Sequence, residues 1–408
     1  MKTLYSLGIR LYSLAIRIAK VFGHNKARKM VDGWRDINRA LQTLKPNVPT
    51  VWFHVSSLGE YEQALPVMQQ YRTLHPNVQQ LLTFFSPSGY EVRHNNSTAD
   101  VVCYFPMDTP GNARRFIERI NPLAVFFVKY DFWFNTLHEL NQRAIPTYIF
   151  SAIFRPGQYF FKWYGGWYLR GLKTYTHIFV QNEQSASLLR AHGINCVTQA
   201  GDTRFDRVWQ IAQSHSGNTP IETFLDNSSR VIVAGSTWEP DEILLARYLK
   251  ETDVPVQIIL APHIISDDHL SNIEKLFPQS ICYSILCKQG GTAKVVIIDN
   301  IGMLSMLYRY ADVAYIGGGF GHGIHNTLEA MTYGKPVIFG TNYHKFKEAC
   351  DIIERQGGWS IASYDELRHR LDSLFTQPTL LSSASTNCLN YVKSNLGSTE
   401  TILNTIEQ

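Results

Sequence analysis

The fold is decided by the stretch from Val51 to Glu60, which reads VWFHVSSLGE. Its first five residues are apolar or aromatic apart from His54, a composition typical of a strand buried on both faces of a parallel sheet. Two serines and a glycine then end the strand, and residues 61–74 continue with a helical pattern. A strand followed directly by a helix is the repeating unit of α/β folds.

The same alternation continues along most of the chain. We expect further strands at 79–85, 101–105, 123–129, 145–150, 177–181 and 196–200, with helices between them, for example at 111–120 and 183–192. A second series of strands follows at 230–234, 256–260, 294–298, 312–316 and 336–339. The alternation predicts two mostly parallel sheets with helices on both faces. A length of 408 residues also suits two domains better than one.

The pattern breaks at 207–229, which contains Gly217, Pro220 and several Ser and Asn residues. We therefore expect a leading segment at 1–25, a first Rossmann-like domain at 26–210, a linker at 211–229 and a second Rossmann-like domain at 230–408. The last helix of the second domain has the option of packing back on the first. Two such domains in tandem predict a central cleft, and ligands of these sheets bind beyond the carboxyl ends of the strands.

The net charge of +4 conceals a basic N-terminal region. Residues 1–50 contain ten Lys or Arg and two Asp, a net charge of +8, which leaves −4 for the remainder. Localised positive charge favours an anionic partner, either nucleic acid or a membrane surface. The six cysteines are scattered without CxxC or Cys/His ligand spacing, so we expect neither a metal site nor a disulfide framework.

Residues 1–24 predict an amphipathic helix. Arginines interrupt every apolar run before it reaches the ~18 residues needed to span a bilayer. Such a helix would lie in the membrane interface with its polar stripe toward the headgroups, which favours a membrane over DNA as the partner. The alternative is a helix packed on its own domain. The polar stripe recurs at spacings of three and four and consists of Ser6, Arg10, Ser13, Arg17, Lys20 and His24.

A glycine-rich turn follows the expected strand at 312–316. Residues 317–323 read GGGFGHG, and residues 325–329 read HNTLE. Glycines let the backbone approach a ligand closely. A helix capped by Asn326 and running to about Tyr333 would offer N–H groups and partial positive charge to a phosphate, and Glu329 would accept hydrogen bonds from ribose hydroxyls. The alternative is a tight turn that only packs against the sheet.

Glu60 opens the helix that follows Gly59. A helix N-terminus stabilises the ionised form of a carboxylate, so we expect Glu60 to be available as a base at neutral pH. The alternative is an ordinary first-turn glutamate that favours the helix dipole. Its position beside Ser56 and Ser57 is what favours a functional role.

Four segments together resemble one family. Residues 54–60, HVSSLGE, resemble the H-x-S-x-G-E signature of Kdo (3-deoxy-D-manno-octulosonic acid) transferases, and residues 318–329 resemble their G-G-S-F … H-N-x-L-E segment. Residues 201–206, GDTRFD, are similar to the family's G-N-x-K-F-D, and residues 340–348 to its G-P … F-K-E. The order and spacing of the motifs agree over about residues 1–360.

The resemblance implies an inverting, metal-independent glycosyltransferase of the GT-B type that needs no cofactor. Its donor would be CMP-Kdo and its acceptor the tetraacylated lipid A precursor of lipopolysaccharide. The protein would lie on the cytoplasmic face of the inner membrane through its N-terminal helix, with no obligatory protein partner and no nucleic acid. Glu60 would be the general base, and Asp131 and Arg204 would stabilise charge in the transition state. The residues implied to hold the nucleotide are Ser236, Thr237, Pro262, His263, Gly302, Met303, Leu304, Gly321, His325, Asn326, Thr327, Leu328 and Glu329.

The chain departs from the family pattern at several positions. The family's Pro-Arg-His is here Pro262-His263-Ile264, so an arginine for the donor phosphate is missing or supplied elsewhere. Its Glu-Thr-Glu is here Lys129-Tyr130-Asp131, its lysine is Arg204, and its Gly-Glu-Leu is Gly302-Met303-Leu304. Two alternatives therefore stay open: a transferase of the same fold that uses another nucleotide sugar, such as a UDP-sugar, and a non-catalytic membrane-associated binding protein on that scaffold.

Overall fold

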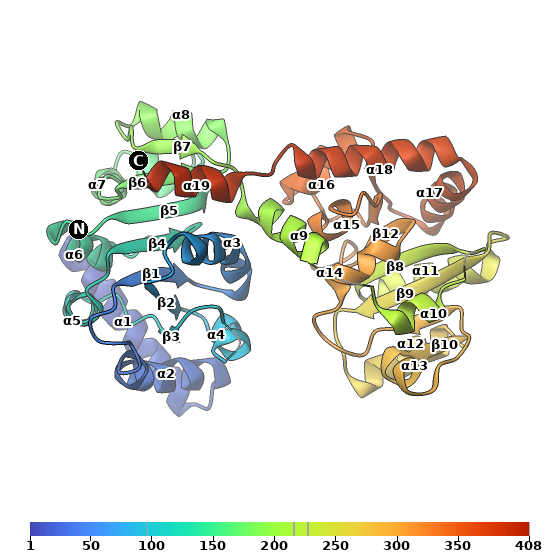
Figure 1. Ribbon diagram of the computed structural model, residues 1–408, viewed down its shortest axis with the longest axis horizontal. Coiled ribbons are helices and arrows are strands. Elements are labelled where there is room, and N and C mark those ends of the chain that lie inside the picture. Colours follow the sequence, from blue (N-terminus) through green and yellow to red (C-terminus); the bar gives the residue numbers. More distant parts are fainter. Residues whose placement is uncertain (96, 215–216, 227, 408) are drawn as a thin grey trace. The chain divides into compact units, whose positions relative to one another are not determined.

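The chain folds into two compact α/β units. The computed structural model describes residues 1–95, 97–214, 217–226 and 228–407 (Figure 1). The first unit comprises Met1–Arg207 together with Leu396–Gln408, and the second comprises Val208–Asn395. Each unit is built on a seven-stranded sheet. The predicted fold class, two Rossmann-like units preceded by a helix, is confirmed.

The sheet of the first unit has the strand order β3-β2-β1-β4-β5-β6-β7, and its pairs are parallel. The central strand β1 lies between β2 and β4. The loops after β1 and β4 therefore flank the point at which the strand order reverses, where sheets of this kind bind ligands. The strands are β1 (Thr50–Val55), β2 (Gln79–Phe84), β3 (Val101–Tyr104), β4 (Ala124–Val128), β5 (Thr147–Ala152), β6 (His177–Val180) and β7 (Val197–Gln199).

Both faces of this sheet are covered by helices, which is why its strands are apolar throughout. Val51 and Phe53 of β1 pack in one apolar cluster, and the intervening Trp52 packs in the other, because successive side chains of a strand point to opposite faces. The helical elements of the first unit are α1 (Lys2–Val21), α2 (Asn25–Leu41), α3 (Leu58–Leu74), α4 (Pro87–Arg93), α5 (Pro110–Ile120), α6 (Phe134–Gln142), η1 (Tyr159–Phe161), α7 (Gly166–Leu172), α8 (Glu183–Ala191) and α19 (Ser398–Ile406).

The sheet of the second unit repeats the plan with the order β10-β11-β9-β8-β12-β13-β14. Its strands are β8 (Arg230–Thr237), β9 (Val256–Pro262), β10 (Ser280–Cys282), β11 (Val295–Ile297), β12 (Val313–Ile316), β13 (Val337–Phe339) and β14 (Gly358–Ser360). Its helical elements are α10 (Thr219–Phe224), α11 (Glu239–Glu251), α12 (Asp267–Leu276), α13 (Tyr283–Gln289), α14 (Leu304–Leu307), η2 (Tyr308–Tyr310), α15 (Leu328–Met331), α16 (Lys347–Glu354), α17 (Tyr364–Thr376) and α18 (Pro378–Lys393), and α9 (Thr203–Ser214) enters it from the first unit.

The segment expected as a linker, 211–229, is more structured than its composition suggested. It contains the end of α9 and the short helix α10, although residues 215, 216 and 227 lie outside the described residues. The segment is tied to the second unit, because the N–H of Asn218 donates to the hydroxyl of Tyr310 at 2.6 Å and Ile221 is buried. Ser, Asn and Pro favour helix caps as well as linkers, and Asn218 is the N-cap of α10.

Residues 396–407 belong to the first unit, so the last helix packs back on the first domain, the option that was left open for the domain expected at 230–408. Ile402 and Leu403 of α19 are buried in the same apolar cluster as Phe53. The carboxylate of Asp206 holds the start of α19, since it accepts from the N–H of Gly397 at 2.8 Å and from the N–H and the hydroxyl of Thr399, both at 2.7 Å. The position of α19 beside the first unit is visible in Figure 1.

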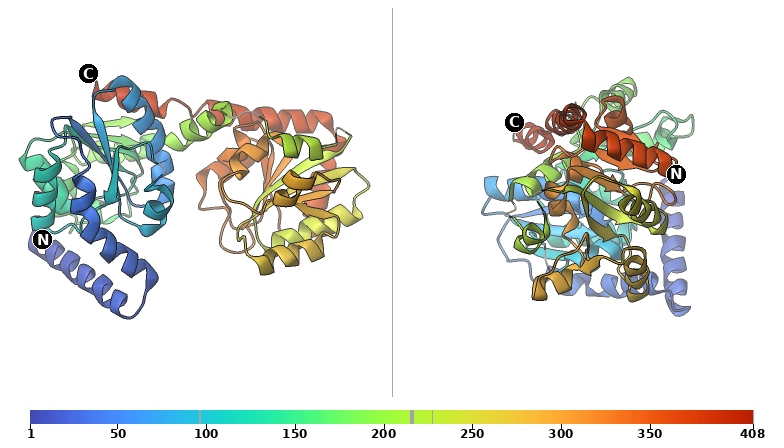
Figure 2. Two further views of the ribbon diagram at one scale, coloured as in Figure 1. Left: turned by 60° about the horizontal axis from the view of Figure 1, so that its bottom comes forward. Right: turned by 90° about the vertical axis from the view of Figure 1, so that its right-hand side faces the viewer.

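The leading helix α1 packs on the first unit. It lies beside α2, to which a short turn joins it (Figure 2). The hydroxyl of Tyr5 donates to Asp108 at 2.6 Å, the hydroxyl of Ser6 donates to Asn135 at 3.1 Å, and Ile16 is in the core. Ser6 is therefore bonded within the protein, although its place in the polar stripe had predicted that it faces lipid headgroups. Lys20 of the same stripe pairs with Asp32.

The opposite side of α1 exposes an apolar face. Its members recur at spacings of three and four, which keeps them on one side of the helix. In the described part of the chain, no helix combines the length and the hydropathy that crossing a membrane requires. The exposed face consists of Leu4, Leu7, Leu11, Leu14 and Ile18, each about half exposed or more.

Candidate active site

The turn after β1 places Glu60 at the switch point of the first sheet. Ser57 and Glu60 form a capping box: the side chain of Ser57 accepts from the N–H of Glu60 at 3.4 Å, and Oε2 of Glu60 accepts from the N–H of Ser57 at 3.0 Å. The same Oε2 accepts from the N–H of Ser56 at 2.6 Å. Within the residues that the structure describes, Oε1 has no such bond. Glu60 is therefore both a helix cap and a carboxylate with one oxygen available.

Asp131 approaches the same turn from the loop after β4. Its Oδ1 accepts from the hydroxyl of Ser56 at 2.5 Å. Its Oδ2 is buried and has no hydrogen-bond partner in the described part of the chain. The loop begins at Lys129, whose φ of 64° is a conformation that residues other than glycine rarely adopt. Backbone strain of this kind is concentrated at functional sites.

Both carboxyl groups hold protons more tightly than isolated ones. Burial raises the pKa of Glu60, and the N–H bond from Ser56 and the charge of Lys129 only partly offset that effect. Burial raises the pKa of Asp131 well above its usual value, and the neighbouring charge of Glu60 raises it further. The expectation that the helix start would dominate Glu60 is thus wrong in direction, because desolvation outweighs it. Two carboxylates in one partly desolvated site compete for a single proton.

A hydrogen-bond network around the buried His54 adjoins Asp131. The indole N–H of Trp133 donates to Nε2 of His54 at 2.9 Å, so Nδ1 carries the ring proton and donates to the hydroxyl oxygen of Thr83 at 2.8 Å. The same oxygen accepts from the indole of Trp52 at 2.8 Å. Burial lowers the pKa of His54 to about 3, so the ring is neutral. Nε2 of His54 lies 3.6 Å from Oδ2 of Asp131.

Sequence reasoning named His54 and Ser56 only as members of the motif at 54–60, without a role in the site, and it missed Trp133. The available signal was the position of His54 inside an apolar strand, because a polar side chain buried there must have partners. Trp133 gave no signal, since it follows β4 by several residues in a loop.

Arg204 lies at the start of α9, where it is paired with Asp202. Its Nε donates to Oδ2 of Asp202 at 2.8 Å, and its backbone N–H donates to Oδ1 at 2.9 Å. Gln63 donates to Oδ1 of the same carboxylate at 2.9 Å. Because Gln63 lies on α3 one turn beyond Glu60, the pair of Asp202 and Arg204 is anchored to the helix that carries the candidate base.

The glycine-rich turn of the second unit follows β12 and is tightly packed. Gly318 has a φ of 89°, which strongly favours glycine, and its N–H donates to Oδ2 of Asp241 at 2.9 Å. Asp241 also accepts from the hydroxyl of Tyr315 at 2.8 Å. A Cβ on Gly319 would meet the backbone of Gly340 at 2.5 Å. These contacts hold the backbone of the turn at the carboxyl end of β12.

The helix after this turn is shorter than predicted. α15 spans only Leu328–Met331 and has Thr327, not Asn326, as its N-cap residue. Asn326 instead bridges the turn, since its Oδ1 accepts from the N–H of Leu328 at 3.1 Å and its Nδ2 donates to Glu329 at 3.0 Å. Four residues sum too few peptide dipoles for the expected effect on a phosphate. Thr327 is fully buried, and its hydroxyl has no partner among the described residues.

Four histidine and tryptophan rings lie beside the turn, and three of them stack one on another. Trp238 stacks on His263 with ring centroids 4.8 Å apart, and His263 stacks on His325 at 4.5 Å. His322 lies 4.8 Å from Trp238. Burial lowers the pKa of His325, and neighbouring His263 lowers it further. The Nε2 of His325 is buried without a partner in the described part of the chain, so this side chain has hydrogen-bonding capacity to spare.

The remaining predicted nucleotide-binding residues lie at the ends of β8 and β9 and near α14. Ser236 has a φ of 54°, and the hydroxyl of Thr237 is already bonded to Glu242 at 2.9 Å. The backbone oxygen of Thr237 accepts from the N–H of His263, which follows Pro262, at 2.9 Å. Leu304 packs against Gly235, while Gly302 and Met303 precede it in the loop and Gly321 lies in the turn.

The structure thus forms two clusters. In the first unit it brings Glu60 and Asp131 together through Ser56, with Arg204 anchored to the same helix as Glu60. In the second unit it brings His263 and His325 together beside the glycine-rich turn.

Comparisons with known proteins point in one direction. Residues 31–207 match a family model described as 3-deoxy-D-manno-octulosonic-acid transferase (kdotransferase). A 3-deoxy-D-manno-octulosonic acid transferase of Aquifex aeolicus is 26% identical over 344 residues, which cover 82% of this chain and 88% of that protein. One from Rickettsia typhi is 24% identical over 368 residues, with coverages of 85% and 76%.

A solved structure of similar fold is the UDP-GlcNAc 2-epimerase from Neisseria meningitidis bound to UDP-GlcNAc. It superposes with a TM-score of 0.62 at 16% identity and covers 88% of this chain and 99% of that one. At this identity the likeness shows the fold alone.

Proposed function

We propose that this chain is a 3-deoxy-D-manno-octulosonic acid (Kdo) transferase, like the family model and the relatives that it matches. It would move Kdo from CMP-Kdo to the tetraacylated lipid A precursor. The observation that carries the proposal is the pair of Glu60 and Asp131, which Ser56 joins at the switch point of the first sheet. An inverting transfer needs a base at the acceptor hydroxyl. Glu60 lies at the switch point, and its Oε1 has no hydrogen-bond partner among the described residues.

In the proposed reaction, Glu60 takes the proton from the acceptor hydroxyl through Oε1. The hydroxyl oxygen forms a bond to the anomeric carbon of Kdo while the bond from that carbon to the phosphate oxygen breaks, and CMP leaves with the bonding pair. A single displacement of this kind inverts the anomeric centre. The raised pKa of Glu60 suits a base that works near neutral pH, because a base of very low pKa has little affinity for the proton.

In this scheme Asp131 would stabilise positive charge and would not transfer a proton. The anomeric centre becomes positive as the bond to phosphate breaks. A buried carboxylate oxygen such as Oδ2, which has no partner among the described residues, stabilises such charge strongly. The carboxylate would be held in place by Ser56. Arg204, fixed by Asp202, would supply positive charge to the departing phosphate.

The donor nucleotide would bind at the glycine-rich turn of the second unit. The hydroxyl of Thr327 and Nε2 of His325, both without a partner in the part of the chain that the structure describes, are groups that a nucleotide would satisfy. The stack of Trp238, His263 and His325 offers aromatic faces and ring N–H groups at the position where the family has an arginine. Glu329, positioned by Asn326, would accept from ribose hydroxyls. Because CMP is a good leaving group, we propose that the transfer requires neither a metal nor another cofactor.

The apolar face of α1 would attach the protein to the cytoplasmic surface of the inner membrane. Leu7, Leu11 and Leu14 lie on the exposed side of the helix and are each more than half exposed. An interfacial helix buries such a face among lipid acyl chains. The acceptor is a membrane glycolipid, so attachment would bring the active site to its substrate without a protein partner.

The test is incubation of the protein with CMP-Kdo and the lipid A precursor, followed by mass spectrometry of the lipid. We expect a mass increase of one or more Kdo units. A parallel incubation with UDP-sugars addresses the alternative donor, and a product formed only with UDP-sugars would contradict the proposal.

The E60Q variant tests the base within the same assay. Glutamine retains an acceptor for the Ser56 N–H but cannot take a proton, so we expect turnover to be lost while CMP-Kdo still binds. E62Q is the matched control, because Glu62 lies on the same helix but pairs with Arg93 and Arg207. Near-normal turnover by E60Q would show that Glu60 is not the base.

A further inference from the structure

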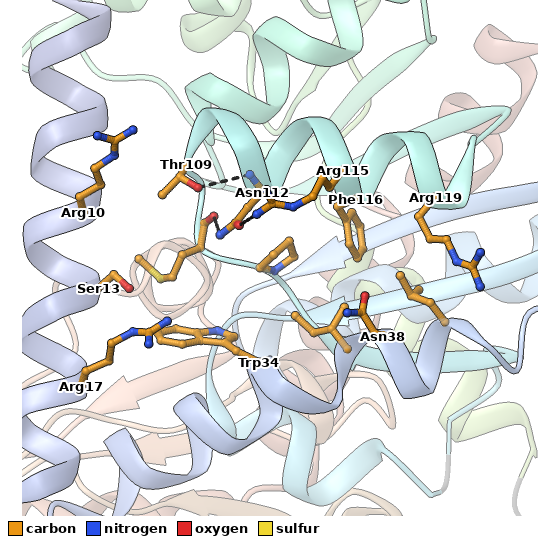
Figure 3. A pocket seen from close by; sticks show the side chains of 14 residues that line it. Arg10, Ser13, Arg17, Trp34, Asn38, Thr109, Asn112, Arg115, Phe116 and Arg119 are labelled. Carbon is orange, nitrogen blue, oxygen red and sulfur yellow. Dashed lines mark hydrogen bonds between the residues drawn. The ribbon is translucent and has the colours of Figure 1, made fainter.

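A polar cavity lies in the first unit, and its lining includes neither Glu60 nor Asp131. It has a volume of about 440 Å³ and is bordered by α1, α2 and α5 (Figure 3). Arg10 and Arg17 come from α1, and Arg115 and Arg119 come from α5; the four reach the cavity from opposite sides. No carboxylate is among its lining residues.

The four arginines have little to neutralise them. In the ranges that the structure describes, no acidic side chain pairs with Arg10, Arg17 or Arg119, and Arg115 donates only to the neutral amide of Asn112, at 2.7 Å. Arginines just outside the cavity behave differently. Arg114, the neighbour of Arg115, pairs with Glu118 at 3.0 Å on the outer side of α5. The cavity therefore gathers four positive charges that no carboxylate among the described residues pairs with.

Neutral donors add to this charge. The hydroxyls of Ser13 and Thr109 and the amide of Asn38 line the same cavity. Thr109 accepts from the N–H of Asn112 at 3.3 Å, which leaves its own proton free to donate. Guanidinium forks match the oxygens of a phosphate in geometry and charge. A bound phosphate would relieve the mutual repulsion of the arginines, whereas a cation or an apolar ligand would not.

The place of the cavity indicates where that phosphate comes from. Arg10 and Arg17 lie on the same helix as the exposed leucine face, and Arg10 is the direct neighbour of Leu11. When the leucines enter the acyl region of a membrane, these arginines come to the depth of the headgroups. A soluble phosphate compound would need no apolar face beside its site.

We propose that this cavity, the four-arginine cavity, binds the phosphate of a membrane-lipid headgroup, with preference for the doubly charged phosphomonoester. The inference rests on the proposed attachment of α1 to a membrane. It goes beyond general attraction of basic residues to anionic lipid, because it assigns a defined site in which Arg115 and Arg119 of α5 act together with α1.

The experiment measures binding of the full chain to phosphatidylcholine vesicles that contain either phosphatidic acid, a phosphomonoester, or phosphatidylglycerol at matched surface charge. R115Q/R119Q changes the cavity without touching the apolar face of α1. The control is R35Q/R39Q, which removes the same charge from exposed sites of α2 outside the cavity. Thermal melting checks that each variant is folded. If R115Q/R119Q does not fold, R10Q/R17Q tests the same cavity from α1.

We expect R115Q/R119Q to weaken binding to phosphatidic acid vesicles about tenfold more than binding to phosphatidylglycerol vesicles. R35Q/R39Q should weaken both equally, since charge near an anionic surface acts without regard to headgroup. Equal effects of the two variants, or equal effects on the two lipids, would overturn the site. Titration with glycerol 3-phosphate addresses the source, and an affinity as high as for phosphatidic acid vesicles would overturn the assignment to a lipid. None of these readouts uses CMP-Kdo, so absence of Kdo transfer would defeat the proposed function and leave this result standing.

Discussion

Ser56 and Asp131 are joined by a hydrogen bond of 2.5 Å between the serine hydroxyl and Oδ1 of the carboxylate. The backbone N–H of the same serine donates to Glu60, so one residue holds both carboxyl groups of the candidate site. The bond to Asp131 favours the ionised carboxylate, and burial opposes it. The balance between these two effects decides how much negative charge the site carries at a given pH.

The S56A variant removes the hydroxyl and keeps the backbone bond to Glu60. The pKa of Asp131 should rise further, because the side-chain hydrogen bond that lowers it is lost. We expect the acidic limb of the pH–rate profile for Kdo transfer to move to higher pH. The rate at neutral pH should fall by up to about tenfold. S57A is the comparison, since it removes instead the side-chain hydrogen bond that lowers the pKa of Glu60 and leaves the bond to Asp131 in place. An unmoved acidic limb would show that ionisation of Asp131 does not limit the rate.

The D131N variant should lose activity and gain stability. A folded-state pKa raised above the unfolded value means that this group favours folding at low pH and that the contribution is lost as pH rises through the folded pKa. Asparagine keeps an acceptor for Ser56 and carries no charge. We therefore expect D131N to be more stable than the parent by about 1–3 kcal/mol in alkaline solution, and the difference to shrink toward acidic pH.

Urea denaturation of the parent and D131N at several pH values gives this comparison. A stability difference that does not change with pH would mean that Asp131 binds protons equally in the folded and unfolded protein, and the raised pKa of the buried carboxyl group would be contradicted.

The T83V variant tests the support beneath the carboxylates. The hydroxyl of Thr83 accepts from Trp52 and His54, both fully buried. Valine leaves two buried donors without an acceptor, at about 1–3 kcal/mol each. T50V is the matched control: Thr50 is a buried threonine of β1, and Gln79, which donates to it, also bonds two backbone oxygens. Urea denaturation that shows equal losses for T83V and T50V would contradict the proposed network.

The L7E/L11E variant tests the apolar face of α1. Both leucines are more than half exposed, so the change should cost the fold little. If the face enters a membrane, binding to anionic vesicles should fall about a hundredfold, because two leucines lose their burial among acyl chains. I243E/I264E, at exposed apolar positions of the second unit, carries the same change of charge. Similar losses for the two variants would point to bulk charge and not to the helix face.

The sequence predicted most of the sheets because strands buried on both faces are apolar without interruption. β10 and β14 were missed because Ser280–Cys282 and Gly358–Ser360 are short and lack such runs. They lie at the edges of the second sheet, where a strand has only one neighbour. The extent of α15 was also wrong, since the pattern after Asn326 is helical but the turn that follows at Gly334, with a φ of 66°, cuts the helix short.

The candidate site could be predicted only one residue at a time. Glu60 and Asp131 each belong to a motif, but their connection through Ser56 depends on β4 lying next to β1, which no local pattern reveals. The direction of the pKa shift of Glu60 was missed for the same reason: a helix start is visible in sequence, whereas burial by distant segments is not. The sequence likewise did not predict that the arginines of α5 and of α1 line one cavity.

The return of α19 to the first unit has a consequence for biosynthesis. The core around Phe53 is completed by Ile402 and Leu403, which the ribosome makes some 350 residues later in the chain. The second unit, contained within Val208–Asn395, has all of its own residues before then. Translation therefore delivers a complete second unit while the first still lacks one cover of its sheet, and the half that begins earlier is the half that matures last.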